Sequence, residues 1–327
     1  MPLLRETSST YITPAREKLK NSTKRNRCPV CNGTGCGVNS QVVLCWRVEA
    51  GSKERVKSGA YLHLRKDFNP FIPQVIKPMD PKASPELIAK VYDSLLDCLV
   101  LEDRHAKELL ARGLPEHIIR KNRYRSTPSK QDGQFVCKYL SDLYNLDYVP
   151  GFYLDETRRM NVKGSGIFIP YRNVAGAIRA MQIRPSRGDT KYFWFSSTDL
   201  YRGASSGSFI HFSRPNVARS KKEIYITEGG LKGDCIASLG SVGVASIAGV
   251  NAVDYDTLVN EIKTGIPEVE KVILAFDSDW KSNPHVKSAL LRLSETASKT
   301  FEVEIEDWSD KKSKGFDDYL LAKRNRL

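Results

Sequence analysis

Short apolar runs alternate with amphipathic segments over the last third of the chain, and the two clearest runs end in acidic residues. These are residues 224–228 (Ile-Tyr-Ile-Thr-Glu) and 272–277 (Val-Ile-Leu-Ala-Phe-Asp). A continuous apolar run of this length, bounded by glycine or a turn, is typical of a strand buried on both faces. The surrounding pattern adds helices at 231–239, 254–262 and 286–297 and strands at 242–248 and 301–305. The alternation predicts a parallel sheet in the order βαβαβαβ.

The middle of the chain has a different pattern. Residues 166–184 indicate two strands joined by a turn. Apolar residues at helical spacing predict three helices upstream, at 86–99, at 103–110 and from residue 114 onward. We interpret His105 and His117, which lie in two of these segments, as surface residues of helices rather than as metal ligands.

Composition changes along the chain indicate several domains. A chain of 327 residues exceeds the usual size of one domain. Five prolines between residues 70 and 85 predict an extended linker, and a domain boundary with it. We expect five parts: a mobile polar tail at 1–23, a cysteine-rich module at 24–66, the linker at 67–85, a helical connector with a basic subdomain at 86–215, and an acidic sheet domain at 216–327.

Acidic residues follow the two central strands of the predicted sheet. Glu228 ends the first strand, and Asp277 and Asp279 follow the second. The carboxyl ends of parallel strands meet at one edge of a sheet, so these side chains converge if the strands are neighbours. Carboxylate oxygens at such a site favour Mg²⁺ or Mn²⁺ over zinc. Acids after strands are also found as solvated loop ends or helix caps, which is the alternative.

Four cysteines are crowded near the N-terminus. Cys28, Cys31, Cys36 and Cys45 fall within 18 residues and begin with a Cys-x-x-Cys pair. Four thiolates at this spacing favour a closed tetrahedral Zn²⁺ site, whereas a redox pair would need only the first two. Seven cysteines in all, an odd number, fit a reduced compartment better than a disulfide framework. No apolar run approaches the length of a membrane span and no signal peptide begins the chain, so we expect a cytoplasmic protein without membrane contact.

Positive charge is concentrated upstream of the acidic site. The net charge is +13, but residues 216–327 hold 16 Lys and Arg against 18 Asp and Glu. Between residues 158 and 192 there are eight basic residues and one acid, with aromatic residues interleaved. This pattern favours a groove that binds phosphates and stacks bases, and a solvated basic face is the alternative. The candidate ligands for nucleic acid or nucleotide are Arg172, Arg179, Arg184, Lys191, Tyr192 and Lys232.

The acidic pattern resembles the TOPRIM domain of bacterial primases and topoisomerases, which carries a Glu after one strand and an Asp-x-Asp after a later one. Residues 314–320 resemble the acidic segment that closes the site in DnaG-type primases. That family has another Asp where this chain has Gly315, so only Asp317 carries over. The cysteine-rich module looks like a shortened version of the zinc ribbon with which these primases begin. Residues 109–119, with their Arg-Gly-Leu, and the basic segment resemble the rest of the primase core.

The resemblance implies an α/β chain of the multidomain α+β kind: a zinc ribbon, a helical connector, a basic α+β subdomain and a C-terminal TOPRIM domain with a parallel sheet. It implies a DNA primase, a nucleotidyltransferase that makes short RNA primers on single-stranded DNA for a phage, plasmid or other mobile element. Ribonucleoside triphosphates would be its substrates, and Zn²⁺ with Mg²⁺ or Mn²⁺ its metals. The implied catalytic residues are Glu228, Asp277, Asp279 and Asp317.

Two other functions remain open. A metal-dependent TOPRIM nuclease would use the same acids to hydrolyse nucleic acid, and a non-catalytic adaptor would only bind single-stranded DNA for a replication protein. Topoisomerase activity is less favoured because no large strand-passage region is present. The chain has no Gly-x-x-x-x-Gly-Lys-Ser/Thr motif, so a replicative helicase would be a separate partner.

Overall fold

The computed structural model describes residues 19–23, 26–39, 42–56, 59–64, 81–249, 252–308 and 313–326, apart from the side chains of Asp279 and His285. The chain divides into two compact units, Met1–Lys77 and Pro78–Leu327. The polar segment up to residue 18 and the expected linker from 67 to 80 lie outside the described residues. None of the helices in the described ranges has both the length and the apolar character needed to cross a membrane.

The first unit is a small antiparallel sheet with the strand order β1-β2-β3-β5-β4. Its buried cluster consists of Val43 and three cysteines, Cys28, Cys36 and Cys45. So few buried apolar groups stabilise a fold weakly, which makes a structural metal physically reasonable here. The strands are β1 (Lys20–Asn21), β2 (Gly37–Val38), β3 (Val42–Cys45), β4 (Glu54–Arg55) and β5 (Tyr61–Leu64).

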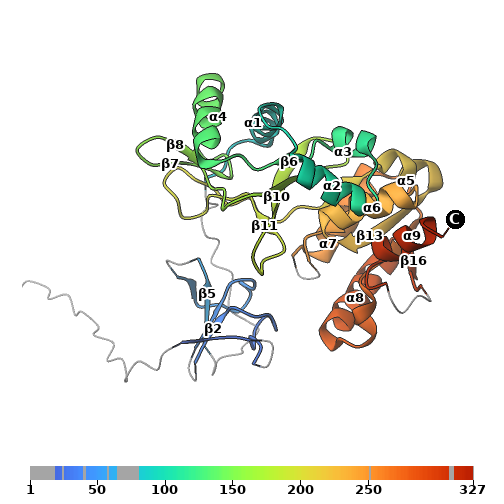
Figure 1. Ribbon diagram of the computed structural model, residues 1–327. Coiled ribbons are helices and arrows are strands. Elements are labelled where there is room, and N and C mark those ends of the chain that lie inside the picture. Colours follow the sequence, from blue (N-terminus) through green and yellow to red (C-terminus); the bar gives the residue numbers. More distant parts are fainter. Residues whose placement is uncertain are drawn as a thin grey trace, which may run out of the picture. The chain divides into compact units, whose positions relative to one another are not determined.

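The second unit begins with helix α1 (Pro85–Asp97). Ser84 caps this helix, because its Oγ accepts a hydrogen bond from the backbone N–H of Leu87 at 3.2 Å, and Pro85 suits the first helical position. The apolar face of α1 packs on strand β10 of a four-stranded antiparallel sheet, ordered β11-β10-β9-β6. Figure 1 shows α1 and α4 close to this sheet.

The remaining elements of this half follow the chain. The helices are α2 (Asp103–Ala111), α3 (Glu116–Asn122) and α4 (Lys130–Leu143). The strands are β6 (Arg125–Ser126), β7 (Phe152–Leu154), β8 (Arg158–Met160), β9 (Gly166–Arg172), β10 (Ile178–Pro185) and β11 (Phe193–Trp194). The two strands predicted within 166–184 are therefore present as the β9–β10 pair, whereas α4 was not predicted.

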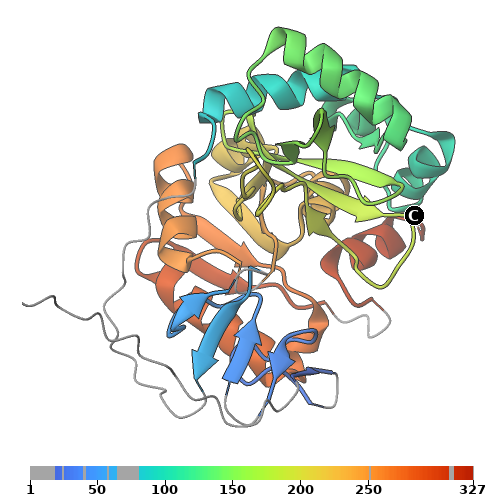
Figure 2. The same cartoon turned by 90° about the vertical axis from the view of Figure 1, so that its left-hand side faces the viewer.

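A second sheet, ordered β12-β14-β13-β15-β16, forms the acidic half of this unit. Its four C-terminal strands pair in parallel, as predicted, and β12 adds an antiparallel edge strand. Helices α7 and α8 cover one face, and α6 and α9 cover the other (Figure 2). The strands are β12 (His211–Ser213), β13 (Glu223–Glu228), β14 (Val244–Ile247), β15 (Lys271–Leu274) and β16 (Glu302–Ile305). The helices are α5 (Pro215–Lys221), α6 (Gly230–Leu239), α7 (Tyr255–Gly265), the 3₁₀ helix η1 (Ser278–Lys281), α8 (Pro284–Ser298) and α9 (Phe316–Arg324).

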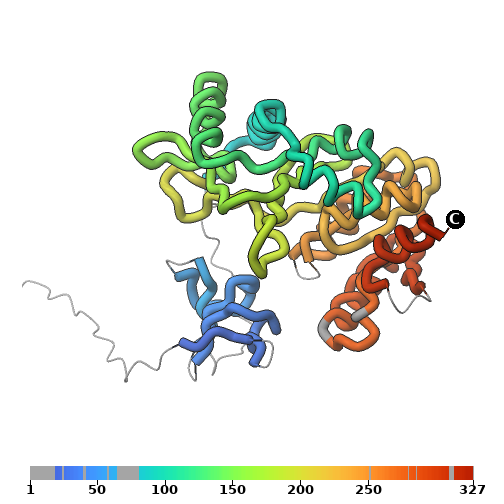
Figure 3. The backbone as a smooth tube through the Cα atoms, in the orientation of Figure 1, coloured from blue at the N-terminus to red at the C-terminus, as the bar shows by residue number. Residues whose placement is uncertain are grey.

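The two sheets share a buried contact around the start of α6. The hydroxyl oxygen of Tyr171 on β9 accepts a hydrogen bond from the backbone N–H of Gly230 at 2.9 Å. Gly113, which ends α2 with φ of +90°, packs against Leu239 of α6 and Leu321 of α9. A larger residue there would be strained by the backbone and crowded by both leucines. The path of the chain through α2, α6 and α9 can be followed in Figure 3.

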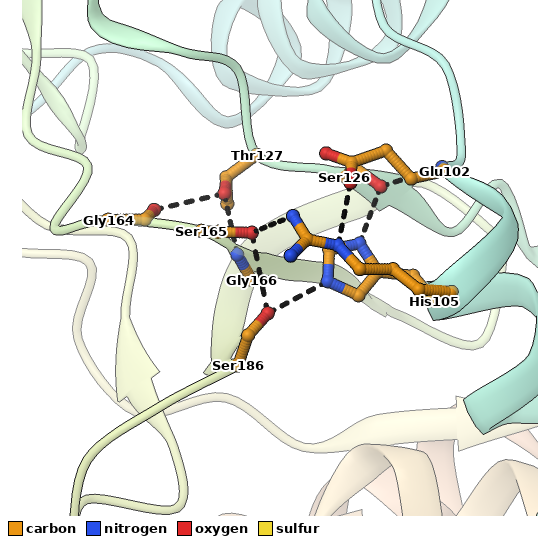
Figure 4. A network of polar contacts seen from close by, with 9 residues as sticks. Glu102, His105, Ser126, Thr127, Gly164, Ser165, Gly166 and Ser186 are labelled. Atoms are coloured by element: carbon orange, nitrogen blue, oxygen red, sulfur yellow. Dashed lines mark hydrogen bonds and ion pairs between the residues drawn. The ribbon is translucent and has the colours of Figure 1, made fainter.

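His105 corrects one expectation from the sequence. It is 2% exposed rather than a surface residue. Its Nδ1 is 2.6 Å from Ser126 Oγ and its Nε2 is 2.8 Å from Ser186 Oγ (Figure 4). Burial lowers the pKa of the His105 ring below its ordinary value. The imidazole therefore links α2 to β6 and to the end of β10, while His117 is exposed as expected.

Candidate functional site

The two acidic strand ends predicted from the sequence do meet at one edge of a sheet. Strands β13 and β15 are direct parallel neighbours, with Ile226 opposite Leu274. Glu228 is the last residue of β13, and Asp277 follows β15 by three residues. Topology therefore brings the carboxyl groups of Glu228 and Asp277 to the same edge.

Lys232 lies among these acids. Helix α6 starts directly after β13, and its Lys232 ammonium donates to Asp277 Oδ1. The other oxygen of Asp277 is 3.4 Å from Lys314 Nζ. Burial by itself would lower the pKa of Lys232, but the negative charges of Asp277, Asp317 and Glu228 raise it above its ordinary value. Lys232, a candidate phosphate ligand in the sequence, thus contacts a carboxylate.

Asp317 completes the acidic cluster from the first turn of α9. Its side chain is buried, and its Oδ1 has no hydrogen-bond partner among the described residues. Burial raises the pKa of Asp317 above its ordinary value, although the Lys232 charge opposes the shift. A carboxylate oxygen withdrawn from water in this way favours a nearby cation.

The donor set fits a hard divalent ion. Glu228, Asp277 and Asp317 supply carboxylate oxygens at one edge of the sheet, and one of those oxygens, Asp317 Oδ1, is buried without a partner in the described part of the chain. Oxygen ligands of this kind suit Mg²⁺ or Mn²⁺. The side chain of Asp279, the fourth predicted catalytic acid, lies outside the described residues.

A basic surface faces Asp317 across a cavity of about 310 Å³. The guanidinium of Arg184 pairs with Glu108, donates to the Tyr192 hydroxyl at 3.2 Å and lies over the Tyr192 ring. The cavity is lined by Glu108, Ala111, Arg112, Arg184, Asp317, Asp318 and Leu321. Of the predicted basic residues, Arg184 with its neighbour Tyr192 is therefore the one that lies beside the acids.

The other predicted basic residues point to different places. Arg172 borders a separate cavity of about 430 Å³ and donates to the carbonyl oxygen of Gly176 at 2.9 Å. The Arg179 guanidinium lies 5.8 Å from the centre of the Phe209 ring. Lys191 is exposed in the loop before β11. The structure thus distributes these residues rather than gathering all of them beside the acidic cluster.

Arg112 and Lys314 are site residues that the sequence analysis did not select. Arg112 belongs to the Arg-Gly-Leu segment, which was noted only as part of the likeness to primases. Its place on the cavity follows from α2 ending at Gly113 against α6 and α9. Arg112 could have been found by asking which cation of that segment has no acidic residue near it in sequence. No such signal marks Lys314.

A serine, a histidine and an aspartate also meet in this unit, but their geometry is structural. Asp234 Oδ1 accepts from His211 Nε2 at 3.0 Å and from Ser213 Oγ at 2.6 Å. His211 Nδ1 accepts from the backbone N–H of Arg172 at 3.0 Å. The histidine therefore has no free nitrogen to take a proton from Ser213. These bonds stabilise the buried Asp234 charge and fix β12 against α6.

The four cysteines form the second candidate site. One sulfur from each lies within 4.8 Å of the others, and this is the group of metal-type ligands found within the described residues. Cys31 Sγ and Cys36 Sγ are 3.7 Å apart. Two sulfurs bound at about 2.3 Å to one tetrahedral ion lie about 3.8 Å apart, so the spacing fits zinc. Cys36, whose role the sequence left open, is within the cluster.

Hydrogen bonds around the cysteines also suit thiolates. Arg47 Nη1 is 3.4 Å from Cys31 Sγ and 3.6 Å from Cys36 Sγ. Although burial opposes it, hydrogen bonds from the Gly33 backbone and from Arg47 lower the pKa of Cys31 to about 7. Burial raises the pKa of Cys36 to about 12. A bound cation would stabilise the thiolate of a cysteine such as Cys36.

Known families and structures agree with this architecture. A family model described as a domain of unknown function (DUF3854) matches residues 216–326. None of the curated proteins matches the sequence. The fold is similar to that of the Aquifex aeolicus primase (zinc binding and RNA polymerase domains), with a TM-score of 0.56 and 17% identity, covering 74% of this chain and 59% of that one. The chain thus spans less than two thirds of the Aquifex chain.

Two further primase structures share the fold. The RNA polymerase domain of Mycobacterium tuberculosis primase DnaG, in complex with a double-stranded DNA oligomer with a 6-nucleotide overhang, gives a TM-score of 0.54 at 14% identity, covering 75% of this chain and 81% of that one. A DnaG primase catalytic domain bound to single-stranded DNA gives 0.50 at 14% identity, covering 74% and 76%. The chain has the fold of DnaG-type primase domains, together with a four-cysteine cluster. The fold class predicted from the sequence is confirmed.

Proposed function

We propose that the protein is a DNA primase, which joins ribonucleotides on a single-stranded DNA template to start replication of a phage, plasmid or other mobile element. The observation that carries the proposal is the cavity in which Arg112 and Arg184 face Asp317, beside Asp277 at the carboxyl edge of the parallel sheet. Cations for phosphate and acids for a divalent ion are both needed for nucleotidyl transfer, and they meet here in a primase fold.

The chain's own residues bind and orient the reactants in this proposal. Arg184 and Arg112 bind the phosphates of an incoming ribonucleotide or of the template, and Tyr192 offers a ring for stacking. The carboxylates of Glu228, Asp277, Asp279 and Asp317 hold Mg²⁺ or Mn²⁺, which neutralises triphosphate charge and orients the attacking 3′-hydroxyl. No general base among the side chains is required.

The remaining parts take supporting roles. The four-cysteine module binds zinc and contacts the template. Arg172, Arg179 and Lys191 extend phosphate binding away from the catalytic edge. The parts are arranged as a tail, a ribbon, a linker to residue 85, a basic half to residue 215 and a TOPRIM half. A separate helicase opens the duplex, and the free cysteines suit the reducing cytoplasm.

Primer synthesis tests this proposal directly. Purified protein, single-stranded template, labelled ribonucleotides and Mg²⁺ or Mn²⁺ should yield short RNA. Glu228→Gln and Asp277→Asn keep the shape of each side chain but delete one negative charge, so synthesis should be lost while DNA binding stays. Glu270→Gln, which changes an exposed acid of the same unit paired with Lys222 at 2.6 Å, is the matched control and should remain active. Undiminished synthesis by Glu228→Gln would refute the assignment.

The same assay separates the other two functions. A nuclease would shorten the template in the presence of metal, and the same two variants would be inactive. An adaptor would neither make RNA nor cut DNA, and the variants would bind as the wild type does. We favour the primase because the Arg184 cavity adds a phosphate site to the acids, and the fold neighbour bound to single-stranded DNA is a primase catalytic domain.

A further inference from the structure

The acidic edge already contains a positive charge from the chain itself. The Lys232 ammonium donates to Asp277 Oδ1, and Lys314 Nζ is 3.4 Å from Asp277 Oδ2. Only about a fifth of each side chain of the Lys232–Asp277 pair is exposed. Both oxygens of the carboxylate expected to bind a metal therefore face ammonium groups.

Gly315 provides the space that this ammonium needs. The backbone of Gly315 has φ of −104°, a conformation open to any residue, so conformational freedom does not explain the glycine. A Cβ at this position would lie 3.3 Å from Lys232 Nζ and 3.4 Å from Asp277 Oδ1, and it would also contact Asp317 Oδ1. A longer side chain at 315 would compete for the place where the ammonium and the two carboxylates meet. The missing acid at 315 and the lysine at 232 are thus one arrangement in space.

We propose that Lys232 is the resident cation of the acidic edge and takes the place of one divalent ion, so that the protein binds a single Mg²⁺ or Mn²⁺ on the Glu228 side. This inference rests on the proposed function, because it assumes that the acids bind metal. A second divalent ion held by Asp277 and Asp317 would lie within a few ångströms of the ammonium, where like charges repel strongly. The ammonium supplies at that position the positive charge that an ion would otherwise bring.

Manganese binding without nucleotide or template tests the inference. Electron paramagnetic resonance of free Mn²⁺, measured during titration of the full chain, counts the ions bound and gives their affinity. Wild type should bind one Mn²⁺ per chain, and Glu228→Gln should lose it. Lys232→Met removes the charge while keeping an apolar chain, and it should bind one additional Mn²⁺, about tenfold or more tightly than any second ion on wild type. An unchanged number and affinity in Lys232→Met would overturn the proposal.

Two further variants guard against misfolding and general charge effects. Lys232→Gln keeps a hydrogen-bond donor for Asp277 without the charge and should show the same gain of one ion. Lys222→Met removes an exposed lysine that pairs with Glu270 in the same unit, and it should bind Mn²⁺ as wild type does. Thermal unfolding gives a second readout, since Mn²⁺ should raise the Tm of Lys232→Met more than that of wild type. Equal Tm increases would count against the resident cation.

The outcome is independent of primer synthesis. A chain that gains the additional ion in Lys232→Met but makes no RNA would support the resident cation and refute the primase. A chain that makes RNA and shows no gain would support the primase and refute the resident cation.

Discussion

Replacing His105 by alanine should destabilise the second unit far more than the same change at His117, although the two histidines lie on adjacent short helices and look alike in sequence. His105 is buried and contacts Ser126 Oγ and Ser186 Oγ at 2.6 and 2.8 Å. Each lost hydrogen bond costs about 1 kcal/mol, and the cavity left by the ring adds to this. We expect a loss of about 2–4 kcal/mol for His105→Ala and about 0.5 kcal/mol or less for the exposed His117→Ala.

The pH dependence of stability gives a second, signed test. Because burial lowers the pKa of His105 in the folded state, the unfolded chain takes up a proton first as the pH falls. Wild type should therefore lose stability below about pH 6.5, the ordinary histidine value, until the folded-state pKa is passed. His105→Gln, which cannot titrate, should lack this part of the loss. Urea unfolding followed by fluorescence at pH 8 and pH 5.5 measures both effects. Equal destabilisation by His105→Ala and His117→Ala would refute the reasoning.

Three other outcomes are expected. Cys36→Ser should reduce bound zinc, measured by elemental analysis, as strongly as Cys28→Ser does, and full zinc in Cys36→Ser would remove that residue from the site. Arg184→Ala should weaken single-stranded DNA binding and reduce the slope of log affinity against log salt by about one, measured by fluorescence anisotropy; an unchanged slope would mean that Arg184 contacts no phosphate. Limited proteolysis should cut first between residues 66 and 85 and leave a folded fragment to residue 327, whereas a first cut after residue 216 would contradict the domain boundary.

The strands of the acidic half could be predicted from the sequence because their signal is local. Ile224–Ile226 and Val272–Leu274 are apolar runs that only a doubly covered strand explains, and each leads to its acid. Side-chain pairing at the site is not local in this sense. Lys232 and Asp277 are 45 residues apart in sequence, and nothing near either residue indicates the other. Their contact depends on α6 packing over the β13–β15 edge.

Two errors of the sequence analysis have specific physical causes. His105 lies one helical turn before Leu109, which is fully buried, so both residues share the inner face of α2. The pattern was present, but a polar ring was assigned to the surface. Helix α4 was missed because it exposes Phe135 and Tyr139 and buries Cys137 and Leu140. Its apolar residues therefore surround the helix and give no clear stripe.

The short antiparallel strand β12 has a consequence for how this chain can be divided. His211–Ser213 form an edge of the acidic sheet, and Ile210 and Phe212 belong to its core. These residues precede the segment 216–326 matched by the family model. A recombinant fragment that starts at residue 216 would expose the edge of β14 and deprive the buried Asp234 of two donors. The conserved name of the segment and its physical boundary do not coincide, and a transplantable module would have to begin before residue 210.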